Sequence, residues 1–230
     1  ERKFKGYIHM QHYVCVSPYA TMYNDICNLA YEKNVSLLIL PFSPQGTIKD
    51  RGDHSFQSIR EVNKMVFQKA PCSVAAFINR GDRDLIQLQL NLPNYDMYKV
   101  TVFFIGGPDD REALAFCRFF ASHPFTTLTL IRLNSEESKV DKNSKDSYAI
   151  ERTLMENESL VEFKEVDCKD GAETTEVLMA VKDEIDLAVV GMHHDSRCGP
   201  LFGLDGEWKE YSEFGVLADF LLSSDFNFSV

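Results

Sequence analysis

The stretch YKVTVFFIGGPDDRE, residues 98–112, decides the fold. Its six residues VTVFFI are apolar or β-branched and carry no charge, which predicts a strand buried on both faces of a sheet. Gly106 and Gly107 then allow a tight turn, and Asp109 and Asp110 favour the start of a helix because acidic groups suit the positive helix N-terminus. The stretch therefore predicts the first βα unit of a doubly wound α/β fold, in which ligands bind just beyond that turn.

Composition sets the broad class of the protein. The chain has 230 residues, 44% of them hydrophobic, which is enough for one large or two small domains. A net charge of −11 argues against nucleic acid or anionic lipid as a partner. The six cysteines form no CxxC pair, which is typical of reduced core cysteines and favours a cytosolic compartment.

Hydrophobic periodicity predicts alternating strands and helices along the rest of the chain. Further strands are predicted at His12–Ser17, Val35–Leu40 (ended by Pro41), Val74–Ile78, Thr127–Leu133, Val161–Asp167, Ile185–Gly191 and Phe226–Val230. Further helices are predicted at Thr21–Lys33, Phe56–Lys69, Tyr148–Asn157, Ala172–Glu184 and Phe214–Ser223.

The sequence repeats itself at a long interval. Shifted by 150 residues, His12–Leu40 aligns without a gap on Glu162–Val190, and the next helix and strand match at a shift of about 154. Such a period indicates two copies of one fold. The same shift places the partner of the 98–112 strand before residue 1, so we expect the first half to lack its leading βα units.

The repeat predicts two doubly wound parallel sheets related by a pseudo-two-fold axis. The first half is predicted to cover residues 1–81, and residues 82–97 form a linker with one amphipathic strand. The second half is predicted to cover residues 98–230. It contains a polar stretch at 134–147 that has too few apolar residues to fold and is predicted to be flexible.

Two groups of residues are candidates for ligand binding, each with a structural alternative. Gly106, Gly107, Asp109 and Asp110 are candidates because a helix N-terminus presents free amides to an anion, although the two aspartates oppose phosphate and could simply cap the helix. The loop after the strand at 185–191 supplies the second group, which comprises Gly191, His193, His194 and Gly199. No spacing in this loop is diagnostic of a metal site, and no catalytic motif is present, so the sequence predicts neither a metal centre nor an enzyme.

Several long segments resemble the cytosolic C-terminal region of plant cation/proton exchangers, the antiporter family called CHX. They are SPYATMYNDICNLA (17–30), SLLILPF (36–42), IREVNKMVFQKAPCSVAAFINRG (59–81), FFIGGPDDREALAF (104–116), DLAVVG (186–191) and EYSEFGVLADFLLSSDF (210–226). The resemblance implies two folds similar to universal stress proteins, attached to a transmembrane antiporter domain that is absent from this chain. It also implies a regulatory and assembly role in exchange of K⁺ or another monovalent cation for protons, in cation and pH homeostasis. The region would lie on the cytosolic face of an endomembrane or the plasma membrane.

The alternative function is that of a nucleotide-binding sensor of the universal-stress type. Universal stress proteins that bind ATP carry an Asp after the first strand and a glycine loop after the fourth. This chain has Ile105 and Gly106 at the first place, and His194 stands where the loop's second glycine belongs. We therefore expect weak or no ATP binding and no cofactor.

The remaining predictions concern contacts and modification. The partners implied are the chain's own transmembrane domain, a second copy in a homodimer, and possible regulatory proteins or kinases. Two segments are candidate interfaces because their apolar groups have no evident place in either core. They are the amphipathic strand with Ile86, Leu88 and Leu90, and the loop with Trp208. Candidate phosphorylation sites in the polar stretch are Ser135, Ser138 and Ser144.

Overall fold

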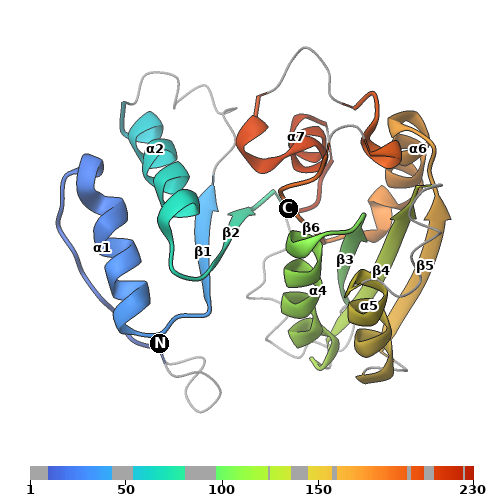
Figure 1. Ribbon diagram of the computed structural model, residues 1–230, viewed down its shortest axis with the longest axis horizontal. Coiled ribbons are helices and arrows are strands. Elements are labelled where there is room, and N and C mark those ends of the chain that lie inside the picture. Colours follow the sequence, from blue (N-terminus) through green and yellow to red (C-terminus); the bar gives the residue numbers. More distant parts are fainter. Residues whose placement is uncertain are drawn as a thin grey trace. The chain divides into compact units, whose positions relative to one another are not determined.

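The computed structural model describes most of the chain and divides it into two compact units (Figure 1). The described residues are 10–42, 54–80, 97–123, 125–135, 145–156, 160–195, 198–204, 210–224 and 226–230. One unit comprises Glu1–Leu40 and Gln45–Ala75, and the other comprises Pro41–Pro44 and Ala76–Val230. Within the described ranges, no helix is both long and apolar enough to cross a membrane.

The second unit is built on a parallel sheet. Its strands are β3 (Tyr98–Phe104), β4 (Thr126–Asn134), β5 (Val161–Asp167) and β6 (Leu187–Val190), in the order β5-β4-β3-β6. Every pairing is parallel, with Val100 of β3 opposite Leu128 of β4 on one side and opposite Leu187 of β6 on the other. This order reverses direction between β3 and β6, so the predicted doubly wound parallel fold is confirmed for this unit.

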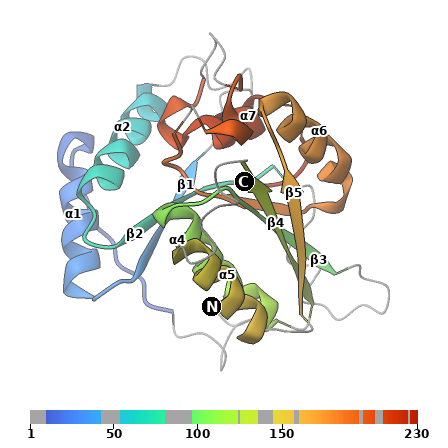
Figure 2. The same cartoon turned by 45° about the vertical axis from the view of Figure 1, so that its right-hand side comes forward.

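Strand β3 lies between two helical layers (Figure 2). Its residues alternate between the faces, so that Val100, Val102 and Phe104 join one buried cluster, while Phe103 is buried on the other face. Figure 2 shows α4 (Pro108–Ala121) and α5 (Lys145–Glu156) together on one side of the sheet. On the other side lie α6 (Gly171–Val181) and α7 (Val216–Ser223). Burial on both faces is the reason that residues 100–104 of β3 carry no charge, while Lys99 lies at the less buried start of the strand.

The described part of the second unit also contains three short 3₁₀ helices and a final bridge. The 3₁₀ helices are η3 (Lys182–Glu184), η4 (Gly199–Leu201) and η5 (Ser212–Phe214). The predicted last strand is reduced to one parallel bridge, in which Ser229 lies opposite Leu187 at the outer side of β6. The end of the chain is also tied to residue Ile78, because the amides and carbonyls of Ile78 and Val230 exchange hydrogen bonds of 2.7 and 3.0 Å.

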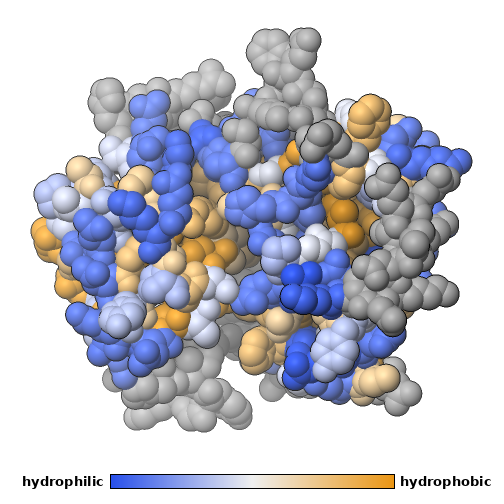
Figure 3. Space-filling view, in the orientation of Figure 1, coloured by the Kyte–Doolittle hydropathy of each residue, from blue (hydrophilic) through white to orange (hydrophobic). Residues whose placement is uncertain are grey.

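The first unit contains two helices and a two-stranded sheet. These elements are α1 (Tyr19–Glu32), β1 (Leu37–Phe42), α2 (His54–Lys69) and β2 (Ser73–Ile78), and the last residues of β1 and β2 belong to the second unit. Leu40, Val62 and Val66 form its buried core, against which Met22 and Ile26 of α1 pack. Hydrophobic residues also reach the molecular surface at several places, seen as orange areas in Figure 3.

The predicted repeat corresponds to a shared order of elements. Shifted by 150 residues, α1 falls on α6 and β1 falls on β6, and at a shift of 154 the last residue of α2 falls on the last residue of α7. Helix, strand and helix therefore follow one another in the same order in both copies.

Besides the last strand, three other predictions about the elements are wrong in whole or in part. Residues 11–18 form no strand, and Val14 and Val16 are 92% and 96% exposed, because a strand is stable only where a neighbour pairs with its backbone and no described strand lies there. Pro41 lies inside β1 and does not end it, which a strand without neighbours on both sides tolerates. The polar stretch 134–147 is shorter than predicted, because Asn134 ends β4 and residues 145–147 begin α5, while residues 136–144 lie outside the described part.

Candidate functional site

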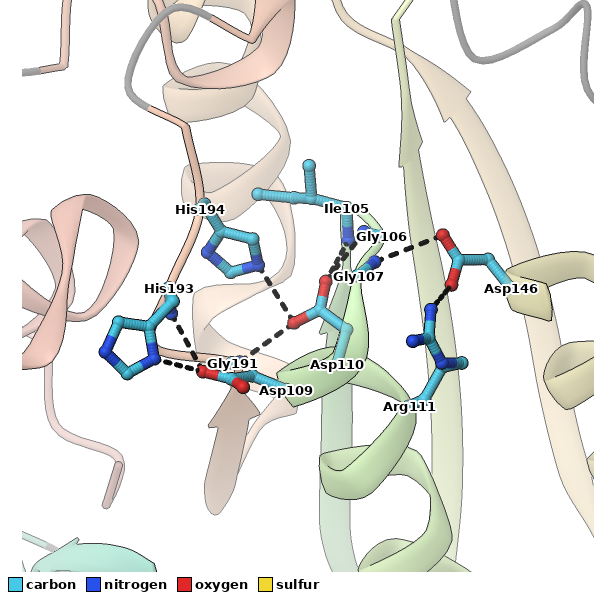
Figure 4. Close-up of polar contacts among 10 residues, drawn as sticks. All are labelled: Ile105, Gly106, Gly107, Asp109, Asp110, Arg111, Asp146, Gly191, His193 and His194. Carbon is cyan, nitrogen blue, oxygen red and sulfur yellow. Dashed lines mark hydrogen bonds and ion pairs between the residues drawn. The ribbon is translucent and has the colours of Figure 1, made fainter. Parts of the chain in front are cut away.

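The candidate site lies where the carboxyl ends of β3 and β6 meet. These two strands are neighbours, and the order of the sheet reverses between them, which is where doubly wound folds bind ligands. Figure 4 shows the segments that come together: the turn from β3 to α4, the first turn of α4, and the residues that follow β6.

Two glycines shape the turn from β3 to α4. Gly106 and Gly107 have φ angles of 137° and 105°, a region that side chains with a Cβ rarely adopt. Gly107 is the N-cap of α4 and Pro108 occupies the first helical turn, where its missing N–H costs nothing. The turn thereby leaves the amides of Ile105, Gly106 and Gly107 without partners in the helix.

Asp110 fills the centre of the site. One of its carboxylate oxygens, Oδ2, accepts hydrogen bonds from the amides of Ile105 at 2.7 Å and Gly106 at 2.8 Å. The other, Oδ1, accepts from the amide of Gly191 at 3.0 Å and lies 3.0 Å from Nε2 of His194. The side chain is fully buried, and its four contacts use all the acceptor positions of an ionised carboxylate. Asp110 thus joins the β3 turn to the segment after β6.

Gly191 allows this close approach. A Cβ atom at Gly191 would lie 2.2 Å from Oδ1 of Asp110 and 2.9 Å from the Asp110 amide nitrogen. Both distances are far below van der Waals contact, so only glycine fits between β6 and the start of α4.

A second aspartate and histidine form a more exposed pair beside the first. Oδ2 of Asp109 accepts from the His193 amide at 3.0 Å and lies 2.7 Å from Nδ1 of the His193 ring. Burial by itself would raise the pKa of Asp109, but the hydrogen bonds and the charge of His193 outweigh it and lower the pKa below its ordinary value. The carboxylate of Asp109 is therefore held ionised against the loop.

A third carboxylate, which the sequence analysis did not identify, completes the site. Oδ2 of Asp146, in the first turn of α5, accepts from the Gly107 amide at 3.1 Å, and the same side chain forms an ion pair with Arg111 of α4. Asp146 lies 39 residues from Gly107, inside the stretch predicted to be flexible, so no local pattern pointed to it.

Five backbone amides that point into the site already have a hydrogen-bond acceptor from the chain itself. The donors belong to Ile105, Gly106, Gly107, Gly191 and His193. The acceptors are carboxylates, so the site presents negative charge where an anionic ligand such as a phosphate would need positive charge. Among the described residues, none forms a hydrogen bond with Nδ1 of the buried His194 ring.

The described residues also bear on metal binding and covalent chemistry. No group of three or more His, Cys, Asp or Glu residues in the described ranges could hold a metal ion. Burial raises the pKa of the thiols of Cys27, Cys117, Cys168 and Cys198, which disfavours the nucleophilic thiolate.

Most ligand candidates from the sequence meet at this one site. The residues brought together are Gly106, Gly107, Asp109, Asp110, Gly191, His193 and His194. Gly199 does not join them, because it packs against Ser135 and the backbone that follows β5. The interface candidates Ile86, Leu88, Leu90 and Trp208 and the phosphorylation candidates Ser138 and Ser144 lie outside the described residues.

Comparison with known proteins defines the class to which this fold and site belong. A family model described as "Plant cation/H(+) antiporter domain" matches residues 1–82, and one described as "Plant cation/H(+) antiporter, C-terminal domain" matches residues 97–230. The chain belongs to the plant cation/H⁺ antiporter family.

Individual relatives agree with this assignment. The chain is 37% identical to Cation/H(+) antiporter 14 and 35% identical to Cation/H(+) symporter 13, both of Arabidopsis thaliana, over its entire length. It spans only 28% of the length of each of these relatives. A solved structure of a universal stress protein from Archaeoglobus fulgidus aligns with 90% of this chain and 63% of its own, at 15% identity and a TM-score of 0.46. The assignment of the fold rests on the strand order of the second unit.

Proposed function

We propose that this chain is the cytosolic regulatory and assembly region of a monovalent cation/proton antiporter, with K⁺ as the cation, that serves cation and pH homeostasis. Its division into a first half at 1–81, a linker at 82–97 and a second half at 98–230 is part of this proposal. Membership of the plant cation/H⁺ antiporter family supports the link to transport. Ion exchange itself requires carboxylates within the membrane, so this region would act on the transporter and not carry the ions.

The observation that carries the proposal is the closed site at β3 and β6. In a doubly wound fold this is the usual place for a small ligand, and here the carboxylates of Asp109, Asp110 and Asp146 occupy its amides. A sensor of nucleotides would need those amides for phosphate. The closed site therefore favours regulation through contacts with other parts of the protein over the alternative, a nucleotide-binding sensor of the universal-stress type.

Regulation through contacts requires surfaces that differ in their binding to two states of the transporter. Large apolar side chains are exposed on neighbouring helices of the second unit, among them Phe119 on α4, at 76%, and Met155 on α5, at 77%. We further propose that self-association uses the strand predicted from the sequence at residues 86–92 or the segment around Trp208, weakly in isolation and more strongly when the membrane domain raises the local concentration. Phosphorylation at Ser135, Ser138 or Ser144 would add charge to the polar stretch and modulate these contacts.

The proposal is tested on the whole antiporter reconstituted in vesicles, with and without the region that corresponds to this chain. K⁺-driven proton movement is followed with a pH-sensitive dye, and dimer content is measured by analytical ultracentrifugation. We expect removal of the region to leave cation selectivity intact but to change the rate or its pH dependence several-fold. An unchanged rate, pH dependence and dimer content would refute the proposed role.

Point variants test the proposed interfaces in the same assay. We expect Trp208→Ala or Leu88→Asp to lower the dimer fraction and to change transport. Phe202→Ala and Leu160→Asp are matched controls, because these side chains are exposed at 63% and 53% in the second unit and are not proposed as interfaces. Loss of dimer in the controls to the same extent would show that the effect is not specific to the surfaces chosen.

A further inference from the structure

We propose that the end of the sheet at β3 and β6 is an anion receptor whose resident anion is the side chain of Asp110. A receptor vacated by removing that side chain would take small oxyanions, such as formate, acetate or inorganic phosphate. This inference goes beyond the regulatory role proposed above and does not depend on it.

The donors of the receptor come from separate segments and converge on one carboxylate. The amides of Ile105 and Gly106 lie in the β3 turn, and the amide of Gly191 follows β6. Helix α4, 14 residues long, adds the positive potential of its N-terminus. Donors brought from two strand ends to one point form an anion-binding arrangement that a helix cap alone does not require.

The buried imidazole of His194 supports the receptor independently of the helix. Its side chain is only 3% exposed, and Nε2 lies 3.0 Å from Oδ1 of Asp110. Nε2 donates to Oδ1 in the tautomer that carries its proton on this nitrogen. Among the described residues, Nδ1 has no partner, so the contact with Asp110 is the one hydrogen bond of this ring within that part of the chain.

The other two aspartates of the site differ from Asp110 in how their charge is balanced. Asp146 has the guanidinium of Arg111 as a partner, and Asp109 faces His193, whose side chain is 73% exposed. Asp110 is fully buried, with three amides and one imidazole around it. Removing the carboxylate of Asp110 therefore leaves four donors that point to the position it vacates.

Chemical rescue tests the proposal on the 230-residue chain. Asp110→Ala removes a group the size of formate, and Asp110→Gly removes one the size of acetate. Thermal unfolding is measured while formate, acetate or phosphate replaces chloride at constant ionic strength. We expect a saturable rise in the unfolding temperature of each variant with the anion of matching size, since a ligand that binds only the folded state stabilises it. The wild type should respond to formate no more than to chloride.

Two controls separate a vacated receptor from a general salt effect. Asp110→Asn keeps the volume of the side chain, so it should be destabilised but not rescued by any of the anions. Asp109→Ala removes an aspartate outside the receptor and should show no saturable response. Adding His194→Gln to Asp110→Ala should weaken formate binding about tenfold, because one charge-assisted donor is altered.

The results decide the proposal in either direction. If Asp110→Ala does not fold in chloride, refolding in formate should recover it, and failure to recover it in any anion would overturn the receptor. A response of Asp110→Ala to formate equal to that of the wild type or of Asp110→Asn would do the same. None of these measurements involves transport, so their failure would leave the proposed regulatory function untouched.

Discussion

Replacing Gly191 by alanine tests whether the approach of β6 to α4 depends on the missing side chain. The added Cβ would lie 2.2 Å from Oδ1 of Asp110, 2.9 Å from the Asp110 amide nitrogen and 3.1 Å from Cβ of Asp109. Two of these three neighbours are fixed by helix α4, so the carboxylate of Asp110 must move away from its position.

The cost follows from the hydrogen bonds that such a movement breaks. Oδ1 of Asp110 would lose its contacts with the Gly191 amide and with Nε2 of His194. Hydrogen bonds to a charged group contribute about 1.5–3 kcal/mol each, so the loss of both is expected to cost about 3–6 kcal/mol. In a chain of this length 1 kcal/mol corresponds to about 2–4 °C, so the unfolding temperature should fall by about 6–24 °C.

Urea unfolding followed by circular dichroism measures this cost, with Gly203→Ala as the control. Gly203 has a φ of 89° and nothing within 4 Å of an added Cβ, so its substitution brings only backbone strain of about 1–3 kcal/mol. In an Asp110→Ala background the clash with Oδ1 is gone, so Gly191→Ala should cost less by at least about 1.5 kcal/mol. If Gly191→Ala costs the same with and without the Asp110 carboxylate, the reasoning from the clash is wrong.

Three further predictions concern the pH dependence of stability, the half-buried Arg80 and nucleotide binding. The pKa of Asp109 is lowered in the folded chain, so its contribution to stability is present above about pH 4 and is lost as the pH falls through the folded pKa. Urea unfolding between pH 3 and 7 should therefore show that His193→Ala loses stability only at the higher pH values. Arg80 donates hydrogen bonds to the carbonyls that end α7, so Arg80→Met should lower the free energy of unfolding in urea by about 2–4 kcal/mol. The control Arg152→Ala, at an exposed position, should lower it by less than about 0.5 kcal/mol. Equal losses for the two variants would contradict this prediction. Calorimetry with ATP and AMP should detect weak or no binding, and micromolar affinity that is lost on Gly106→Val would favour the nucleotide sensor.

The sequence predicted those elements of the fold that local pattern determines. The strand Val161–Asp167 was predicted with the bounds that it has in the structure, and the uncharged run at 100–105 was placed in the central strand β3. The failures have a different origin. The pattern at 12–17 shows that the residues could form a strand, but whether a neighbour pairs with them is not a local property. Pro41 was likewise predicted to end its strand. Whether a proline ends a strand depends on which side of the strand is paired, and this is not visible in the local sequence.

The site was predicted in two parts that the sequence did not connect. The Gly-Gly-Pro-Asp-Asp turn and the loop after β6 were separate candidates, and the parallel pairing of β3 with β6 is what brings Asp110 against Gly191. The adjacent residues His193 and His194 contact different aspartates of the first turn of α4. Arg111 and Asp146 could not be predicted, because their contact depends on the packing of α5 beside α4 across 35 residues of sequence.

The closed site has a consequence for how variants of this chain should behave in the whole transporter. The contacts of Asp110 both exclude an anion and fasten the turn after β3 to the segment after β6, so substitutions at Asp110 or Gly191 act first on the stability of the second unit. Such variants should reduce transport in proportion to the amount of folded protein, with the pH dependence of each remaining molecule unchanged. Variants at contact surfaces, such as Trp208→Ala, should do the reverse: the unfolding temperature stays constant while transport per molecule changes. Measuring both quantities on the same samples therefore separates the two classes, and a site variant with normal stability but altered transport per molecule would show that the closed site itself carries a signal.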